Sequence, residues 1–270
     1  MTKFDTPELQ EATKAYLAGN YETAFNLFCE LAGENNGRAM YFLGNFFAGI
    51  KGVNVVKHST GMYSAWYKLG SGRGDALATL AYYGVLTEEE DVTTSEFNDC
   101  LEAVKAIAID GDVFAKMELY FTYAFANHVK RDEKEAFKWC REAAEAGNPD
   151  GMMQLGFCYA GGWGVEKDYE EACKWYQKAA ELNNSRAMYF LGLLFYDGRG
   201  VKQNHVEAFK WYMKAAELGE NGAMYSLGAA YEEGLGVEKN YGEALRWYQK
   251  AYDFGLEKAE PKLEELLKKI

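Results

Sequence analysis

The chain has 270 residues, 49% hydrophobic and 16% aromatic, which is ample apolar material for a packed core. Its formal charge of −12 argues against nucleic-acid binding, because phosphates need a surface rich in Lys and Arg. No basic region followed by an apolar core opens the chain, and no run of about 18 apolar residues occurs, so we expect neither a secretory signal nor a membrane span.

The chain opens with an irregular helix pair, predicted at 7–18 and 20–33, and we assign residues 1–36 to this divergent N-terminal pair. Two divergent repeats follow, and then four repeats of 36 residues. Residues 257–270 are rich in Lys and Glu and predict a polar capping helix, which a terminal repeat needs for solubility. The whole chain, 1–270, is predicted to be one solenoid domain whose two sets of repeats cover 37–111 and 112–256.

Two pairs of residues mark the repeat. An aromatic pair recurs every 36 residues, at Trp175-Tyr176, Trp211-Tyr212 and Trp247-Tyr248, with Trp139-Cys140 one period earlier. A Leu-Gly pair recurs with the same period, at Leu155-Gly156, Leu191-Gly192 and Leu227-Gly228, with Leu119-Tyr120 one period earlier. A fixed period shared by independent residue classes indicates a repeat architecture.

The first two repeats follow the pattern less strictly. Leu43 to Leu80 is 37 residues and Leu80 to Leu119 is 39, and the surplus lies between the two helices of each repeat. Longer loops are therefore predicted at roughly 48–62 and 84–96.

Each repeat predicts two helices, such as 186–197 and 205–218. Apolar residues of the first helix fall on one face at helical spacing. Paired glycines, Gly198 and Gly200, then end that helix and turn the chain. Gly192 has no side chain, so the second helix can approach closely. Because one such pair cannot bury its apolar face alone, the pairs must stack into a superhelix.

The repeated pattern Ala-Met-Tyr-x-Leu-Gly, followed by Gly-x-Gly-Val and then Ala-x-x-Trp-Tyr-x-Lys-Ala-Ala-Glu, resembles the Sel-one-like repeat (SLR), a relative of the tetratricopeptide repeat. The resemblance covers about residues 20–256. It implies an all-α, right-handed α-solenoid of antiparallel helix pairs with about six to seven repeats. It also implies an adaptor or scaffold for protein assembly, and some bacterial members resemble immunity proteins that neutralise a toxic effector.

Repeats two and three depart from the family pattern. In repeat two, residues 87–92 replace the glycine-rich loop. Repeat three has Tyr120 where the family pattern has glycine, and residues 126–128 where the pattern has the glycines of the loop. Such breaks can mark a functional site, but neutral drift in a tolerant loop explains them more often.

The cysteines and histidines show no site for chemistry. Some secreted family members hold each repeat with a disulfide, but the five cysteines here show no paired or CxxC spacing, which favours reduced thiols in the cytoplasm. None of the three histidines stands at metal or triad spacing from a second ligand, and we interpret His205 as structural. We therefore predict no enzyme activity, no catalytic residue, no metal and no cofactor. The cysteines are Cys29, Cys100, Cys140, Cys158 and Cys173, and the histidines are His58, His128 and His205.

The candidate site is a row of residues on the first helix of each repeat, opposite the core stripe, which should line the concave side. Arg38 and Arg186 stand in this row five residues before the leucine marker. Its aromatic and aliphatic members predict a partner-binding surface, because contiguous exposed aromatic residues usually mark one. The predicted row is Tyr41, Tyr82, Phe114, Phe121, Phe125, Phe157, Tyr189, Leu193, Tyr196 and Tyr225.

The predicted function is a monomeric, non-catalytic adaptor that holds a protein or peptide on this concave row, and the acidic charge favours a basic partner. The rim formed by the longer loops of repeats one and two is a second candidate surface. The alternative function is an immunity-type inhibitor that neutralises a toxin or effector by occlusion. An enzyme on a helical scaffold is the third hypothesis, and it has no polar constellation to support it.

Overall fold

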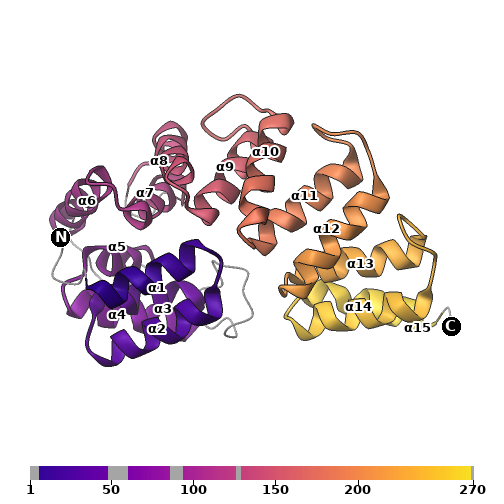
Figure 1. Ribbon diagram of the computed structural model, residues 1–270, viewed down its shortest axis with the longest axis horizontal. Coiled ribbons are helices and arrows are strands. Elements are labelled where there is room, and N and C mark those ends of the chain that lie inside the picture. The colour runs from indigo at the N-terminus through magenta and orange to yellow at the C-terminus, as the bar shows by residue number, and fades with distance from the viewer. Residues whose placement is uncertain (1–5, 48–59, 86–93, 126–128, 269–270) are drawn as a thin grey trace. The chain divides into compact units, whose positions relative to one another are not determined.

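The computed structural model describes residues 6–47, 60–85, 94–125 and 129–268, which form fifteen α-helices, one 3-10 helix and no strand (Figure 1). The helices are α1 (Pro7–Leu17), α2 (Tyr21–Gly33), α3 (Gly37–Phe47), α4 (Thr60–Gly72), α5 (Ala76–Val85), α6 (Thr94–Ile109), α7 (Val113–Phe125), α8 (Glu133–Glu145), α9 (Pro149–Gly161), α10 (Tyr169–Glu181), α11 (Ser185–Asp197), α12 (His205–Glu217), α13 (Asn221–Glu233), α14 (Tyr241–Asp253), the 3-10 helix η1 (Glu257–Ala259) and α15 (Glu260–Leu267).

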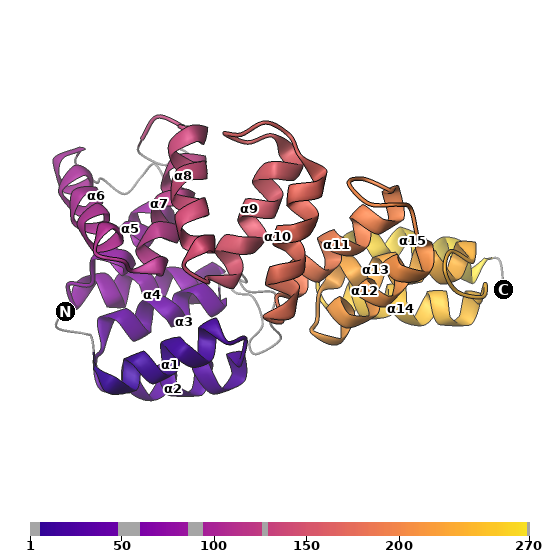
Figure 2. The same cartoon turned by 45° about the horizontal axis from the view of Figure 1, so that its top comes forward.

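The all-α repeat architecture predicted from the period is confirmed. Within each of its two units, helices that follow one another along the chain pack side by side, most extensively within the pairs α3–α4, α7–α8, α11–α12 and α13–α14 (Figure 2). The helices predicted at 186–197 and 205–218 are α11 and α12, within about one residue at each end. The predicted loops at 48–62 and 84–96 and the departures at 87–92 and 126–128 fall largely or wholly outside the described residues.

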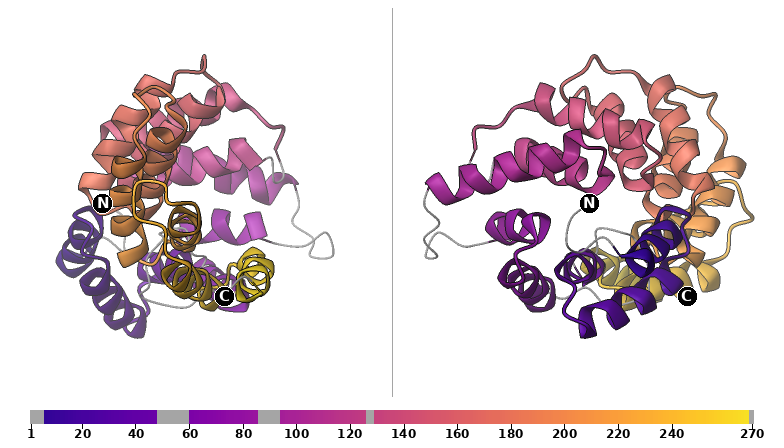
Figure 3. Two further views of the ribbon diagram at one scale, coloured as in Figure 1. Left: turned by 90° about the vertical axis from the view of Figure 1, so that its right-hand side faces the viewer. Right: turned by 60° about the vertical axis from the view of Figure 1, so that its left-hand side comes forward.

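The chain divides into two compact units. Helices α1 to α9 belong to the first, which ends at Lys167, and α10 to α15 belong to the second, which begins at Asp168. In the second unit, α15 packs on α14 at the yellow C-terminal end of the ribbon (Figure 3). Leu266 lies against Ala244 and Tyr248 of α14, with Leu263 beside them, so α15 covers the last repeat. The C-terminal helix thus buries one apolar face and leaves Glu260, Glu264 and Glu265 exposed, as a capping helix should.

An Asp or Asn residue caps the N-terminus of the second helix in each regular repeat. The side chains of Asp168 and Asn204 accept hydrogen bonds from the backbone amides of Glu171 and Glu207, which lie in the first turns of α10 and α12. Such caps satisfy amide groups that a helix leaves without partners at its N-terminus. Because each regular repeat carries its own capping residue, the starts of these helices follow closely from the sequence.

The glycine of the Leu-Gly marker makes room for the tyrosine of the Trp-Tyr marker. A Cβ on Gly192 would lie 2.5 Å from the ring of Tyr212, and one on Gly228 would lie 2.6 Å from the ring of Tyr248. Both tyrosines are buried. The predicted reason for the glycine, close approach of the second helix, is therefore confirmed.

Repeat three reverses this contact. Tyr120 takes the place of the glycine, and Cys140, 20 residues later, takes the place of the tyrosine, just as Tyr212 follows Gly192 by 20. Both side chains are buried, and both donate to α9: the Tyr120 hydroxyl to Gln154 at 3.2 Å and the Cys140 thiol to the backbone carbonyl of Gly151 at 3.4 Å. The large and the small residue have exchanged helices, so packing explains the departure at Tyr120.

In the loops that follow α11 and α13, the second glycine contacts the previous repeat. Gly236 has φ 75°, and a Cβ there would lie 2.2 Å from the backbone carbonyl oxygen of His205 at the start of α12. Gly200 has φ 69° and lies in the same way against Tyr169 at the start of α10. The loop therefore contacts the preceding repeat through backbone, where a side chain cannot move aside.

Gly236→Ala is expected to lower the free energy of unfolding by about 2–4 kcal/mol, because a left-handed alanine is strained and its methyl group meets backbone. Urea denaturation followed by circular dichroism measures the loss. Gly242→Ala is the control, because Gly242 is exposed within α14 and alanine there should raise stability by about 0.5–1 kcal/mol. Equal effects of the two substitutions would contradict the backbone contact.

Candidate functional site

Two members of the predicted row are buried. Tyr41 is 1% exposed and Phe114 is 4% exposed, so the prediction that these side chains face an open groove is wrong. The Tyr41 hydroxyl donates a hydrogen bond of 2.7 Å to Glu118 of α7, and burial together with this carboxylate raises the pKa of Tyr41. Helices α3 and α7, two repeats apart, thus meet directly.

Tyr16 of α1 explains the burial of Phe114. Its ring is fully buried, with its centroid 5.5 Å from that of Phe114 and 5.9 Å from that of Phe42. Its hydroxyl donates a hydrogen bond of 2.9 Å to Asp150 of α9. The N-terminal pair therefore covers inward-facing residues of repeats one, three and four, and in this part of the first unit the row is core.

Arg38 is a third member of the row that is buried. It donates from Nε to Asp75, 2.8 Å away, and from Nη1 to Asp112, 2.7 Å away. Asp75 and Asp112 also accept backbone hydrogen bonds at the starts of α5 and α7. One guanidinium thus links the N-termini of three consecutive first helices, and the two carboxylates raise its pKa against the opposing effect of burial.

Other row members of the first unit stay accessible. Phe121 and Phe125 stack with their centroids 6.1 Å apart, and Phe125 is 66% exposed. Phe157 of α9 is 41% exposed, and Tyr82 is half-buried with the Lys68 ammonium 5.6 Å from its ring centroid. These four residues remain candidates for contact with a partner.

The second unit brings three row members together around one pocket. Leu193 and Tyr196 from α11 and Tyr225 from α13 line a cavity of about 180 Å³. Tyr189, the fourth row member in this unit, is half-buried with its ring centroid 6.0 Å from that of Tyr212, which also lines the cavity. We call this cavity the α11–α13 pocket.

The walls of the α11–α13 pocket are mainly apolar. Its further lining residues are His205, Ala208, Phe209, Tyr212, Ser226, Ala229, Ala230, Glu233 and Leu235. The ring of His205 lies edge-on to Tyr196, with centroids 5.1 Å apart, so the structural role expected for His205 includes one wall of this pocket. Glu233 is exposed and supplies a carboxylate among these lining residues.

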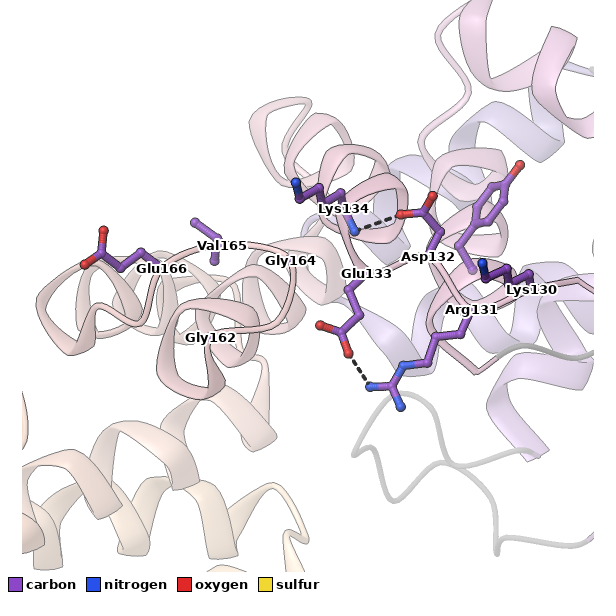
Figure 4. Close-up of a pocket in the computed structure, with 10 residues that line it drawn as sticks. Lys130, Arg131, Asp132, Glu133, Lys134, Gly162, Gly164, Val165 and Glu166 are labelled. Atoms are coloured by element: carbon purple, nitrogen blue, oxygen red, sulfur yellow. Dashed lines mark hydrogen bonds and ion pairs between the residues drawn. The ribbon is translucent and has the colours of Figure 1, made fainter.

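A larger and more open hollow, of about 810 Å³, lies between the loops of repeats three and four and is lined by Lys130, Arg131, Lys134 and Glu166 among others (Figure 4). One ion pair joins two of its charged lining residues. Arg131 pairs with Glu133 at 2.8 Å and lies 5.0 Å from the centroid of the Trp163 ring, while Asp132 caps α8. This hollow is lined mainly by charged and glycine residues, whereas the α11–α13 pocket is lined mainly by apolar and aromatic ones.

Cys100 and Cys140 are not arranged for nucleophilic chemistry. Burial raises the pKa of Cys140 and, with nearby carboxylates, raises the pKa of Cys100 to about 11, so both thiols stay protonated near neutral pH. Within the described residues, no group of three or more His, Cys, Asp and Glu side chains could hold a metal ion. None of the described helices combines the length and apolar character that crossing a membrane requires.

Stacked helix pairs with a 36-residue period define an α-solenoid of the tetratricopeptide type. The Sel1 repeat pattern matches residues 123–148, 149–184, 185–220 and 222–255. The chain belongs to the Sel1 repeat family, as the motif resemblance predicted. No curated protein matches it.

Solved structures agree with this assignment. A Sel1 repeat protein from Oxalobacter formigenes is 30% identical with a TM-score of 0.58, and the match covers 91% of this chain and 99% of that one. The Escherichia coli protein c5321, described as a protective antigen of uropathogenic strains with an SLR fold, is 27% identical with a TM-score of 0.62. That match covers 91% of this chain but 52% of c5321, so this chain spans about half the length of that relative.

The immunity protein Pa5087 from Pseudomonas aeruginosa is a weaker match. It is 24% identical with a TM-score of 0.46, over 68% of this chain and 67% of that one. A likeness of this size carries no argument about function.

Sequence reasoning missed two residues that shape the surface. Tyr16 lies in the irregular opening pair, where no repeat register indicates which way a side chain faces. Ala229 could have been found, because it stands two residues after Leu227, where Phe157 and Leu193 follow their own leucine markers. A small residue at a position usually filled by a large one is a signal for a pocket.

Proposed function

We propose that this protein is a non-catalytic adaptor that holds a protein or peptide partner on the accessible part of the row. The observation that carries the proposal is the cluster of Leu193, Tyr196 and Tyr225 around an open apolar pocket. Aromatic side chains that are partly exposed around a pocket are the residues that dominate binding energy at protein interfaces. Sel1 repeat proteins generally bind protein partners, which supports the same conclusion.

The proposed surface excludes the two buried row members. It comprises residues of both units, each available on its own unit: Tyr82, Phe121, Phe125, Phe157, Tyr189, Leu193, Tyr196 and Tyr225. We propose a cytoplasmic location, because all five thiols are free and a reducing compartment keeps them so. We also propose that the protein acts as a monomer.

The Leu193→Ala/Tyr196→Ala/Tyr225→Ala variant is expected to recover its main partner at least about tenfold less well than the native chain, because truncated anchor residues typically lose this much affinity. Affinity capture from a lysate of the encoding organism, quantified by mass spectrometry, measures recovery. The matched control is Trp163→Ala/Tyr252→Ala/Phe254→Ala, which removes three exposed aromatic residues outside the row. If the row variant is folded and recovers the partner as well as this control does, the row is not the binding surface.

The immunity-type inhibitor stays the alternative prediction, supported by the acidic charge alone. A toxic effector encoded beside this gene, together with rescue of effector-poisoned cells by the native chain, would favour it over an adaptor.

A further inference from the structure

We propose that the α11–α13 pocket receives one apolar side chain of a partner peptide and that Glu233 pairs with a Lys or Arg next to that side chain. This inference rests on the proposed adaptor function and specifies what the adaptor recognises. It concerns the second unit alone, since every lining residue of the pocket belongs to α11, α12, α13 or the turn that follows α13.

The pocket exists because repeat six lacks a side chain that neighbouring repeats have. At the position two residues after the leucine marker, repeats three, four and five carry Phe121, Phe157 and Leu193, whereas repeat six carries Ala229. Ala229 lines the pocket and is half-buried. The unfilled volume therefore corresponds in register to the side chain that the other repeats place there.

The volume limits what can enter. About 180 Å³ is smaller than the roughly 300–1,000 Å³ typical of pockets for small-molecule ligands and cofactors, and it suits a single side chain. Leu193, Phe209 and Leu235 make the walls apolar, and the rings of Tyr196 and Tyr225 extend them. Such walls favour Leu, Met or Phe, because apolar surface removed from water on both sides drives the contact.

The carboxylate of Glu233 at the pocket determines which residue the peptide should carry next to its apolar side chain. Glu232 and Glu233 are adjacent on α13 but differ in their partners. Glu232 accepts a hydrogen bond of 2.9 Å from the Tyr248 hydroxyl and lies 3.6 Å from the Lys262 ammonium. Glu233 forms no ion pair with any residue that the structure describes, and it lines the pocket. A carboxylate without an ion-pair partner attracts a cationic group of the peptide and repels an acidic one.

Selection of a phage-displayed random-peptide library on the immobilised native chain tests the inference. We expect the enriched peptides to share a Leu, Met or Phe with a Lys or Arg beside it. Synthetic copies of the enriched peptides are then titrated by fluorescence polarisation against Ala229→Phe and Ala229→Leu, which fill the pocket with residues that other repeats carry at this position. Filling should weaken binding about tenfold or more.

A charge exchange tests the second half of the inference. Glu233→Lys should weaken the basic peptides and strengthen their Lys→Glu versions, whereas Glu217→Lys, which makes the same change of net charge at an exposed site on α12, should do neither. Circular dichroism establishes that each variant is folded.

The outcomes separate this inference from the adaptor function. Peptides that bind native and Ala229-filled chains equally overturn the pocket, as does a native chain that enriches no peptide above bare matrix. Peptides enriched without a basic residue overturn the role of Glu233. In each of these cases the adaptor function is judged independently by recovery of the main partner from lysate.

Discussion

Tyr120→Gly is expected to destabilise the first unit by about 3–5 kcal/mol, because it leaves a cavity where a buried ring stood. Cys140→Tyr is expected to cost about 1–3 kcal/mol, because a second ring does not fit beside the first. The double variant Tyr120→Gly/Cys140→Tyr should be more stable than either single variant, since it restores the arrangement of Gly192 and Tyr212.

Thermal and urea denaturation of the four proteins provides a double-mutant cycle for this pair. A coupling energy of about 2 kcal/mol or more in favour of the double variant is the expected result. Additive losses would mean that Tyr120 and Cys140 do not exchange roles. The departure of repeat three would then need an explanation other than packing.

Arg38→Met is the second substitution with a large expected effect, about 3–5 kcal/mol. Removing the guanidinium leaves Asp75, with a side chain 1% exposed, and Asp112 without their cation. The triple variant Arg38→Met/Asp75→Asn/Asp112→Asn should lose less than the single variant, because Asn keeps both helix caps and carries no charge. Urea denaturation measures both losses.

Arg186→Met is the control for Arg38→Met, since Arg186 occupies the same position in repeat five. Arg186 is half-buried, and its charge only partly offsets the burial that raises the pKa of Glu220. The control should cost about 1 kcal/mol or less. If Arg186→Met lowers the free energy of unfolding as much as Arg38→Met does, the ion pairs of Arg38 with Asp75 and Asp112 add no stability beyond that of the half-buried arginine.

The fold could be predicted from the sequence because its signals are local and repeated. Caps such as Asp168 and Asn204 begin helices, left-handed glycines such as Gly198 end them, and the Leu-Gly and Trp-Tyr pairs fix which helices pack together. Each signal acts within one repeat or between neighbours, so a single period reveals the whole arrangement.

The accessible surface could be predicted only in part, because exposure depends on residues far apart in sequence. The register placed Tyr196, Tyr225 and Phe114 in one row, but Tyr196 and Tyr225 line a pocket, whereas Tyr16 covers Phe114. The hydrogen bond from Tyr16 to Asp150 spans 134 residues, and no pattern within a repeat reports it. Position on a helix indicates a face; tertiary packing decides whether that face meets water.

Gly200 and Gly236 each contact the backbone of the previous repeat, and this contact affects how the chain can gain or lose repeats. Deleting residues 185–220, one complete 36-residue segment, would bring Gly236 to the place of Gly200, against the start of α10. The repeats on either side of the deletion would then meet through the same kind of glycine contact that each makes in the native chain. Whole-repeat gain and loss is therefore structurally conservative in this chain, whereas an insertion of any other length between helices must be absorbed by a loop.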